Sequence, residues 1–412
     1  MARIFKDRVI TAIDVGTTKI CVLIAQQLTE DEIEIIGIGR APSDGLSKGV
    51  VVNVAKTIKS IKSAVEEAEL AAGITVESAY VGISGGHIQS LNSHGVVPIK
   101  KGYVRPSDIE AVLDAAKAIP IAEGYQILHV LPQYFIIDGQ DRLIDPVDMY
   151  GIRLEVQAHI ILGAVASVQN LVKCCESAGI KVNDIILEQL ASADAVLSED
   201  EKDLGIAVLD IGGGTSDLAL YRYGSIRHTM VLPVAGNHFT NDIAVGLRTT
   251  HKDAEDIKKE YGCAWHPIMQ QDPQMITIHD AHGSAEQQVS LERLHRIVEA
   301  RGRELLELVK HDITQKQLEP FMQAGLVITG GGSLLNGMQE LAYSIFKKPV
   351  RIGTPTSSYA LPEALSTPLY ATSYGLLVYA SNHHKNSATR SLSGPLYQKI
   401  VARMRSWVSD FF

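Results

Sequence analysis

Apolar runs of strand length that lead straight into a glycine-bearing loop recur along the chain. The first two are AIDVGTTKI at 12–20 and VLDIGGGTSDLAL at 208–220, and the third is VITGGG at 327–332. A glycine leaves neighbouring backbone N–H groups uncovered, and in the first two runs an Asp-x-Gly order places a carboxylate beside them. The pattern predicts three strand-to-loop corners, of which the first two are related.

Between these corners, strands and helices alternate. Further strands are expected at 9–14, 19–26, 33–40, 80–83 and 159–166. Apolar positions three and four residues apart predict helices at 54–72, 167–178, 290–311 and, with a break near Arg248, 237–262. Helix 54–72 should end at Gly73. Another helix should begin at Ser107, with a capping box to Glu110, and end before Pro120. The alternation is typical of an α/β protein.

Changes in the spacing of apolar residues and in glycine content also divide the chain into segments. Residues 84–163 hold short strands, glycines and one helix, and we interpret them as an inserted small α/β domain. Residues 381–395 (SNHHKNSATRSLSGP) lack apolar periodicity, and we expect a flexible linker over 383–395. At 412 residues the chain is too long for a single core, which also favours several domains.

Composition limits the kinds of partner and the cellular compartment that we expect for this protein. The net charge of −9 gives the body no general attraction for nucleic acid, so we expect no nucleic-acid partner. The four cysteines fit neither a disulfide framework nor zinc spacing, which favours a reducing cytoplasm. Neither a signal peptide nor a run of membrane-spanning length is visible.

The two Asp-Gly corners have the chemistry of a polyphosphate site. Uncovered N–H groups bind phosphate, and carboxylates bind a metal that bridges phosphates. The expected phosphate contacts are Gly16, Thr17, Thr18, Lys19, Gly212, Gly213, Gly214 and Thr215. Bare carboxylates would repel phosphate, so Asp14 and Asp210 imply Mg²⁺ held partly through water. For any single loop the alternative is an ordinary tight turn, and Lys19 could equally be a solvated lysine.

Catalysis would need one more group to position a nucleophile. The candidates are Glu188 and Gln189 in ILEQLASADA, between the two halves, although capping or packing roles are equally open to them. The sequence offers no convincing further base for a kinase substrate, so slow or absent ATP turnover is the expectation.

The last 17 residues form an amphipathic pattern. Its members are Leu396, Ile400, Met404, Trp407, Val408 and Phe411 on one stripe, with Phe412 at the end and the basic Lys399, Arg403 and Arg405 beside it. Such a stripe could be a core or partner-binding helix. A terminal position, a preceding linker and mixed aromatic and basic residues favour an interfacial anchor on anionic lipid.

The three corners resemble those of the actin, heat-shock chaperone and sugar-kinase superfamily. That resemblance implies that Gly330, Gly331 and Gly332 approach the adenosine. Residues 254–262 are similar to the ribose-contacting helix of bacterial actins, which implies contacts from Glu255 and Lys258; the alternative is an i,i+3 surface pair. The segment VAGNHFTNDIA adds Gly236 and Asn237 to the implied nucleotide site.

With the inserted domain and the amphipathic end, the whole chain resembles the FtsA family of bacterial actin-like division proteins. The resemblance implies a duplicated actin-like (ribonuclease H-like) α/β fold around a nucleotide cleft. The implied subdomains are 1–83 with 364–382 (1A), 84–163 (1C), 164–244 with 305–363 (2A) and 245–304 (2B), followed by the linker 383–395 and the helix 396–412.

The same resemblance implies a function at the septum. It implies ATP and Mg²⁺ binding, self-association into filaments, and attachment to anionic lipids on the cytoplasmic side of the inner membrane. The FtsZ C-terminal tail would bind 245–304, with Arg301 and Lys310 as candidate contacts or merely a solvated face, and later division proteins would bind 84–163. The alternatives are a soluble ATPase or small-molecule kinase whose tail packs on its own body, and an actin-like platform protein of a pilus or secretion system.

Overall fold

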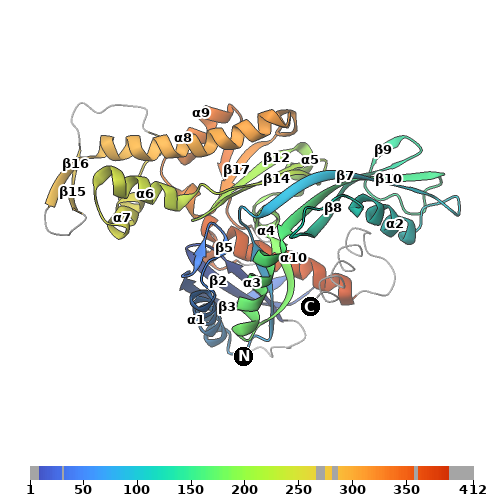
Figure 1. Cartoon of the computed structure of the whole chain (residues 1–412), viewed down its shortest axis with the longest axis horizontal. Coiled ribbons are helices and arrows are strands. Elements are labelled where there is room, and N and C mark those ends of the chain that lie inside the picture. The colour runs from blue at the N-terminus through green and yellow to red at the C-terminus, as the bar shows by residue number, and fades with distance from the viewer. Residues whose placement is uncertain (1–8, 30–31, 266–273, 281–285, 357–360, 389–412) are drawn as a thin grey trace.

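Two five-stranded sheets with the same topology form the centres of the two halves (Figure 1). The computed structural model describes residues 9–29, 32–265, 274–280, 286–356 and 361–388. The first sheet contains β1 (Val9–Val15), β2 (Lys19–Gln27), β3 (Ile33–Pro42), β6 (Ser78–Ile83) and β11 (Lys181–Leu187). The second contains β12 (Ile206–Ile211), β13 (Ser216–Arg222), β14 (Ser225–Leu232), β17 (Gly325–Thr329) and β18 (Val350–Ile352).

The order of strands shows the duplication. The sheets run β3-β2-β1-β6-β11 and β14-β13-β12-β17-β18. In each, the strand that ends at an Asp-Gly corner pairs antiparallel with the next strand and parallel with a later one. The predicted duplicated α/β fold is therefore confirmed.

Helices cover the sheets and lie between them. Strands β1 and β12 are buried almost throughout, as expected of strands covered on both faces. The first sheet packs with α1 (Val54–Ala72) and α3 (Val165–Ser177), and the second with α6 (Gly236–Leu247), α8 (Leu291–Gln315) and α9 (Met338–Phe346). Helices α4 (Glu188–Val196) and α10 (Ala371–Ala388) pack on each other in one core that contains strands of both sheets.

The inserted domain has a sheet and a core of its own. Its elements are β7 (Ile88–Pro98), α2 (Pro106–Lys117), β8 (Tyr125–Ile137), β9 (Gln140–Leu143) and β10 (Arg153–Ala164). The strands form an antiparallel sheet in the order β7-β10-β8-β9, and the domain extends to one side of the second sheet (Figure 1).

Small elements complete the chain. A hairpin of β4 (Leu46–Ser47) and β5 (Val50–Val51) follows β3, and α5 (Glu199–Leu204) precedes β12. The small lobe at the far side of the second half contains α7 (His251–Tyr261), β15 (Met275–His279) and β16 (Glu286–Ser290). Short 3₁₀ helices occupy Glu319–Phe321, Gly331–Leu334, Glu363–Leu365 and Pro368–Tyr370.

At two places the ends of helices lie where the sequence predicted them. Helix α1 has the predicted bounds: Asn53 caps its start by accepting from the Lys56 N–H, and Gly73 ends it at φ 68°. The break at Arg248 between α6 and α7 is also confirmed.

The predicted capping box of Ser107 and Glu110 is wrong. Helix α2 begins at Pro106, and the Arg105 N–H donates to Asp108 Oδ2 at 2.9 Å. Proline favours the first helical position because it has no N–H to leave unsatisfied, and it sets the start ahead of Ser107.

The predicted linker is wrong over 383–388, where α10 continues to Ala388. Polar residues can extend a helix that already exists without burying an apolar face. The rest of the linker, 389–395, and the amphipathic segment 396–412 lie outside the described residues. Within the described part of the chain, no helix is long and apolar enough to cross a membrane.

Candidate nucleotide cleft

The two Asp-Gly corners touch each other where the two halves meet, and this meeting place is the candidate nucleotide cleft. A Cβ placed on Gly213 would lie 2.3 Å from Thr18 Cγ2, and one on Gly214 would lie 2.3 Å from Thr17 Oγ1. Only a residue without a side chain permits this approach. The structure therefore brings the predicted phosphate residues of both loops to one place.

The second loop has the form of an anion cradle. Its carbonyl groups are engaged, since Gly212 O accepts from Gly236 N at 3.0 Å and Gly213 O accepts from Asn237 N at 2.8 Å. The N–H groups of Gly213 and Gly214, by contrast, donate to no other described residue. Free N–H groups on a loop with bound carbonyls suit phosphate oxygens, so the residues present fit a nucleotide. Gly236 and Asn237 support this loop through the start of α6.

Asp14 and Asp210 end equivalent strands and are both buried. Ser373 Oγ donates to Asp14 Oδ2 at 2.8 Å. Asp210 Oδ2 accepts from Ser192 Oγ at 2.5 Å and from Thr372 Oγ1 at 2.8 Å. Burial raises the pKa of both carboxyls, and these hydrogen bonds and the charge of Lys19 oppose that rise.

The carboxylates also fit a magnesium ion shared with phosphate. No cluster of three or more His, Cys, Asp or Glu side chains among the described residues could hold a metal alone. Mg²⁺ usually takes one or two protein carboxylates and completes its shell with phosphate and water. Asp14 and Asp210 are the side chains that would hold it, and the ion would offset their charge toward phosphate.

Lys19 is engaged at the edge of the cleft. Its ammonium donates to the Leu369 carbonyl and lies 4.6 Å from the centre of the Tyr370 ring.

The two catalytic candidates are the first residues of α4. The pKa of Glu188 lies well above its ordinary value, because of burial first and then the charges of Asp14, Asp217 and Asp210. Gln189 is fully buried, and neither polar atom of its amide has a partner among the described residues.

Asp217 is a member of the cluster that the sequence reading missed. Ser84 Oγ donates to its Oδ1 at 2.5 Å, and Thr215 Oγ1 donates to its Oδ2 at 2.9 Å. Burial raises the pKa of Asp217 to about 7. The sequence does carry one signal for Asp217: it lies as far after the glycine-bearing loop 212–215 as Asp210 lies before it, and the two residues pair in the β12–β13 ladder. Ser84, Ser192, Thr372 and Ser373 were also missed, and their sequence neighbourhoods carry no comparable signal.

The third loop and the implied ribose residues join the same cleft. Gly330 lies against the second corner, since a Cβ there would be 2.2 Å from Asp210 Oδ1, and Gly331 and Gly332 continue this loop. Lys258 Nζ donates to Glu255 Oε2 at 2.7 Å and to Gly236 O at 3.2 Å. Glu255 and Lys258 are thus tied to the start of α6 and are no free surface pair.

Two related corners, one cleft and a duplicated sheet define an actin-like nucleotide-binding protein. Solved structures with this fold include a protein of the PilM–PilN type IV pilus biogenesis complex (TM-score 0.67, 17% identity, 90% of this chain and 98% of that one). MreB5 of Spiroplasma citri bound to ADP also matches (TM-score 0.59, 16% identity, 93% and 99%). At these identities the likeness concerns the fold alone.

The chain belongs to the FtsA family of cell division proteins. The family model "Cell division protein FtsA" matches residues 207–375, and "SHS2 domain inserted in FTSA" matches 85–162. Cell division protein FtsA of Pseudomonas aeruginosa is 42% identical over 418 residues, covering 100% of both chains. The Escherichia coli K12 protein of the same name is 35% identical, covering 97% of this chain and 96% of its own.

The buried Asp217 carboxyl predicts a pH-dependent effect on stability. Its pKa of about 7 in the folded protein exceeds the ordinary 3.8, so between these values the folded state binds a proton that the unfolded state lacks. Above pH 7 the ionised group destabilises the fold. Asp217→Asn should therefore raise the free energy of unfolding at pH 8 by on the order of 1–3 kcal/mol, and the gain should shrink toward pH 5.5.

Urea unfolding of the metal-free protein at both pH values measures this difference, with the exposed Asp203→Asn as control. A gain of equal size at both pH values would show that Asp217 does not titrate as described.

Proposed function

We propose that this protein is an ATP- and Mg²⁺-dependent, membrane-tethered cell division scaffold that anchors FtsZ to the cytoplasmic face of the inner membrane at the septum. The observation that carries the proposal is the contact of Gly213 and Gly214 with Thr17 and Thr18 beside the buried Asp14 and Asp210. A polyphosphate bound there touches both halves, so it favours their closed arrangement over an open one.

Slow turnover fits this role. A general base must be ionised to accept a proton from water. Burial, and then the charges of Asp14, Asp217 and Asp210, raise the pKa of Glu188, so its carboxyl stays protonated to a higher pH than an ordinary glutamate does. We infer that ATP serves mainly to hold the two halves together, with little or slow hydrolysis.

The magnesium assignment predicts a specific effect of Asp210→Asn. The variant should lose at least about tenfold in ATP affinity when Mg²⁺ is present, because one carboxylate of the ion's shell is gone. Without Mg²⁺ it should bind ATP as well as the wild type or better, because a charge that repels phosphate is gone.

Isothermal titration with and without Mg²⁺ separates the two effects, and the exposed Asp200→Asn is the matched control. Equal losses in both conditions would contradict a role for Asp210 in metal binding.

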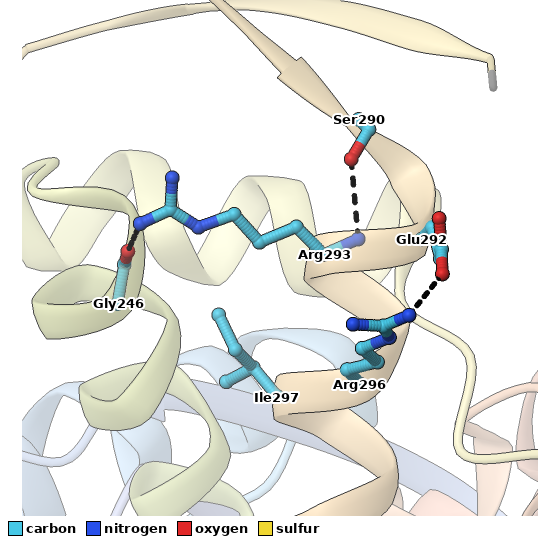
Figure 2. Close-up of a pocket in the computed structure, with 6 residues that line it drawn as sticks. All are labelled: Gly246, Ser290, Glu292, Arg293, Arg296 and Ile297. Carbon is cyan, nitrogen blue, oxygen red and sulfur yellow. Dashed lines mark hydrogen bonds and ion pairs between the residues drawn. The ribbon is translucent and has the colours of Figure 1, made fainter.

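A cationic hollow on the small lobe supports the FtsZ interaction (Figure 2). It has a volume of about 470 Å³ and is lined by Gly246, Ser290, Glu292, Arg293, Arg296 and Ile297. Arg293 crosses the hollow and donates to the Gly246 carbonyl at 2.7 Å, while Arg296 pairs with Glu292. Two exposed arginines beside apolar Ile297 suit a short peptide with acidic and apolar side chains.

Arg301 and Lys310 are poorer candidates for this contact. Arg301 is bound to Asp242, with Nε 2.5 Å from Oδ2, and Lys310 Nζ donates to the Ile345 carbonyl at 2.8 Å. Both are only half-exposed, whereas Arg293 and Arg296 are exposed, so a solvated face does not describe Arg301 and Lys310.

The hollow predicts that Arg293→Glu and Arg296→Glu each weaken binding of an FtsZ C-terminal tail peptide by about tenfold or more. Fluorescence anisotropy with a labelled peptide measures this, and Lys252→Glu makes the same charge change on α7 of the same lobe. If the Lys252 variant loses as much affinity, general electrostatics rather than the hollow accounts for the binding.

Recruitment of later division proteins and filament formation are supported by the inserted domain. Tyr150, Ile144 and Ile152 on this domain are 83%, 80% and 79% exposed. Exposed apolar groups of this size, close together in the chain, are typical of protein-binding surfaces.

The membrane tether rests on the sequence of 396–412 and on family membership. Each basic residue near an anionic surface contributes about 1 kcal/mol, and partial insertion of large apolar side chains adds to this. One tail should therefore bind reversibly, whereas several tails on one filament should bind persistently.

The tether predicts that a chain ending at Gly394 no longer floats with vesicles that contain anionic lipid. Trp407→Glu in the full chain should reduce flotation in the same way and leave ATP affinity unchanged, because residue 407 lies in the terminal segment. Flotation of the truncated protein at the wild-type level would refute the anchor.

A further inference from the structure

The β4–β5 hairpin reaches the nucleotide cleft with its tip. Lys48 and Gly49 form the turn, both with left-handed backbone (φ 50° and 75°). Left-handed backbone is uncommon for lysine and costs roughly 1–2 kcal/mol, so the surroundings must hold this turn in place. One such contact is visible: the Gly49 N–H donates to Thr17 Oγ1 of the first phosphate loop at 3.0 Å.

The two residues that follow β6 contact the turn from the other side. A Cβ on Gly49 would lie 2.7 Å from the Ser84 carbonyl oxygen and 2.9 Å from Gly85 Cα. Ser84 itself donates to Asp217, and its Oγ lies 3.4 Å from Thr215 Oγ1 of the second phosphate loop. The tip of the hairpin is therefore held between elements that touch both phosphate loops.

The Lys48 side chain is exposed, and its charge is felt in the second half. Its charge acts on His238, whose pKa is lowered by burial first and then by Arg301 and Lys48. His238 lies in the first turn of α6, beside the residues that hold the second phosphate loop. Lys48 forms no ion pair with any residue that the structure describes, whereas Lys258 and Arg301 in this region are both paired with carboxylates.

We propose that Lys48 is a binding residue for the terminal phosphate of a nucleoside triphosphate. The inference rests on the proposed function and adds to it a residue that distinguishes a nucleoside triphosphate from a diphosphate. The tip of the hairpin that carries this ammonium lies against Thr17 and Ser84, beside the place where both phosphate loops meet. A third phosphate would supply an anion for this cation, and a diphosphate has one phosphate fewer to offer. The hairpin would thus make closure depend on the triphosphate.

Lys48→Gln tests this role because it removes the charge and keeps a flexible polar side chain that is only one atom shorter. Isothermal titration of the full chain with ATP and with ADP, both with Mg²⁺, should show about tenfold weaker ATP binding and unchanged ADP binding. Lys62→Gln, an exposed lysine on α1, should change neither affinity. Lys48→Arg should restore the preference for ATP because it restores the charge.

The outcomes separate this inference from the proposed function. Equal losses for ATP and ADP, or no loss for either, would overturn the role of Lys48 while leaving the cleft as a nucleotide site. A wild-type protein that binds neither nucleotide would refute the proposed function itself. Unchanged thermal unfolding of the nucleotide-free variant shows that its fold is intact.

Discussion

Three buried carboxylates, Asp14, Asp210 and Asp217, lie with the half-buried Glu188 where the two halves meet, and the architecture depends on how their charge is balanced. Burial raises the pKa of each, and for three of them a neighbouring carboxylate raises it further. Desolvated like charges are unfavourable unless hydrogen bonds, cations or protons offset them. A metal ion bound with phosphate would offset them best, so binding and closure of the halves become one event.

The hydroxyl groups around this cluster come from elements that connect the halves. Ser192 lies on α4 and Thr372 and Ser373 on α10, the two helices that pack between the sheets. Ser84 directly follows β6 and directly precedes the inserted domain. A change in the charge of the cluster therefore acts on the helices between the halves and on the root of the inserted domain. That connection is what a nucleotide-dependent scaffold requires.

The sequence was informative wherever one local pattern determined one local structure. The Asp-Gly corners predicted the facing loops, and the apolar spacing of 54–72 with Gly73 predicted α1 with its correct bounds. It was uninformative where partners lie far apart in the chain: the hydrogen bond of Ser373 to Asp14 joins residues 359 positions apart. Competing local signals caused the other errors. Pro106 set the start of α2 ahead of Ser107, and polar residues after Asn382 continued a helix where a linker was expected.

The central claim is that one nucleotide is held by both phosphate loops, and hydrogen–deuterium exchange tests it most directly. ATP with Mg²⁺ should slow amide exchange at residues 14–19 and 210–215 together, at the same nucleotide concentration, because the ligand touches both halves. Protection of only one loop, with exchange in the other unchanged, would contradict the account.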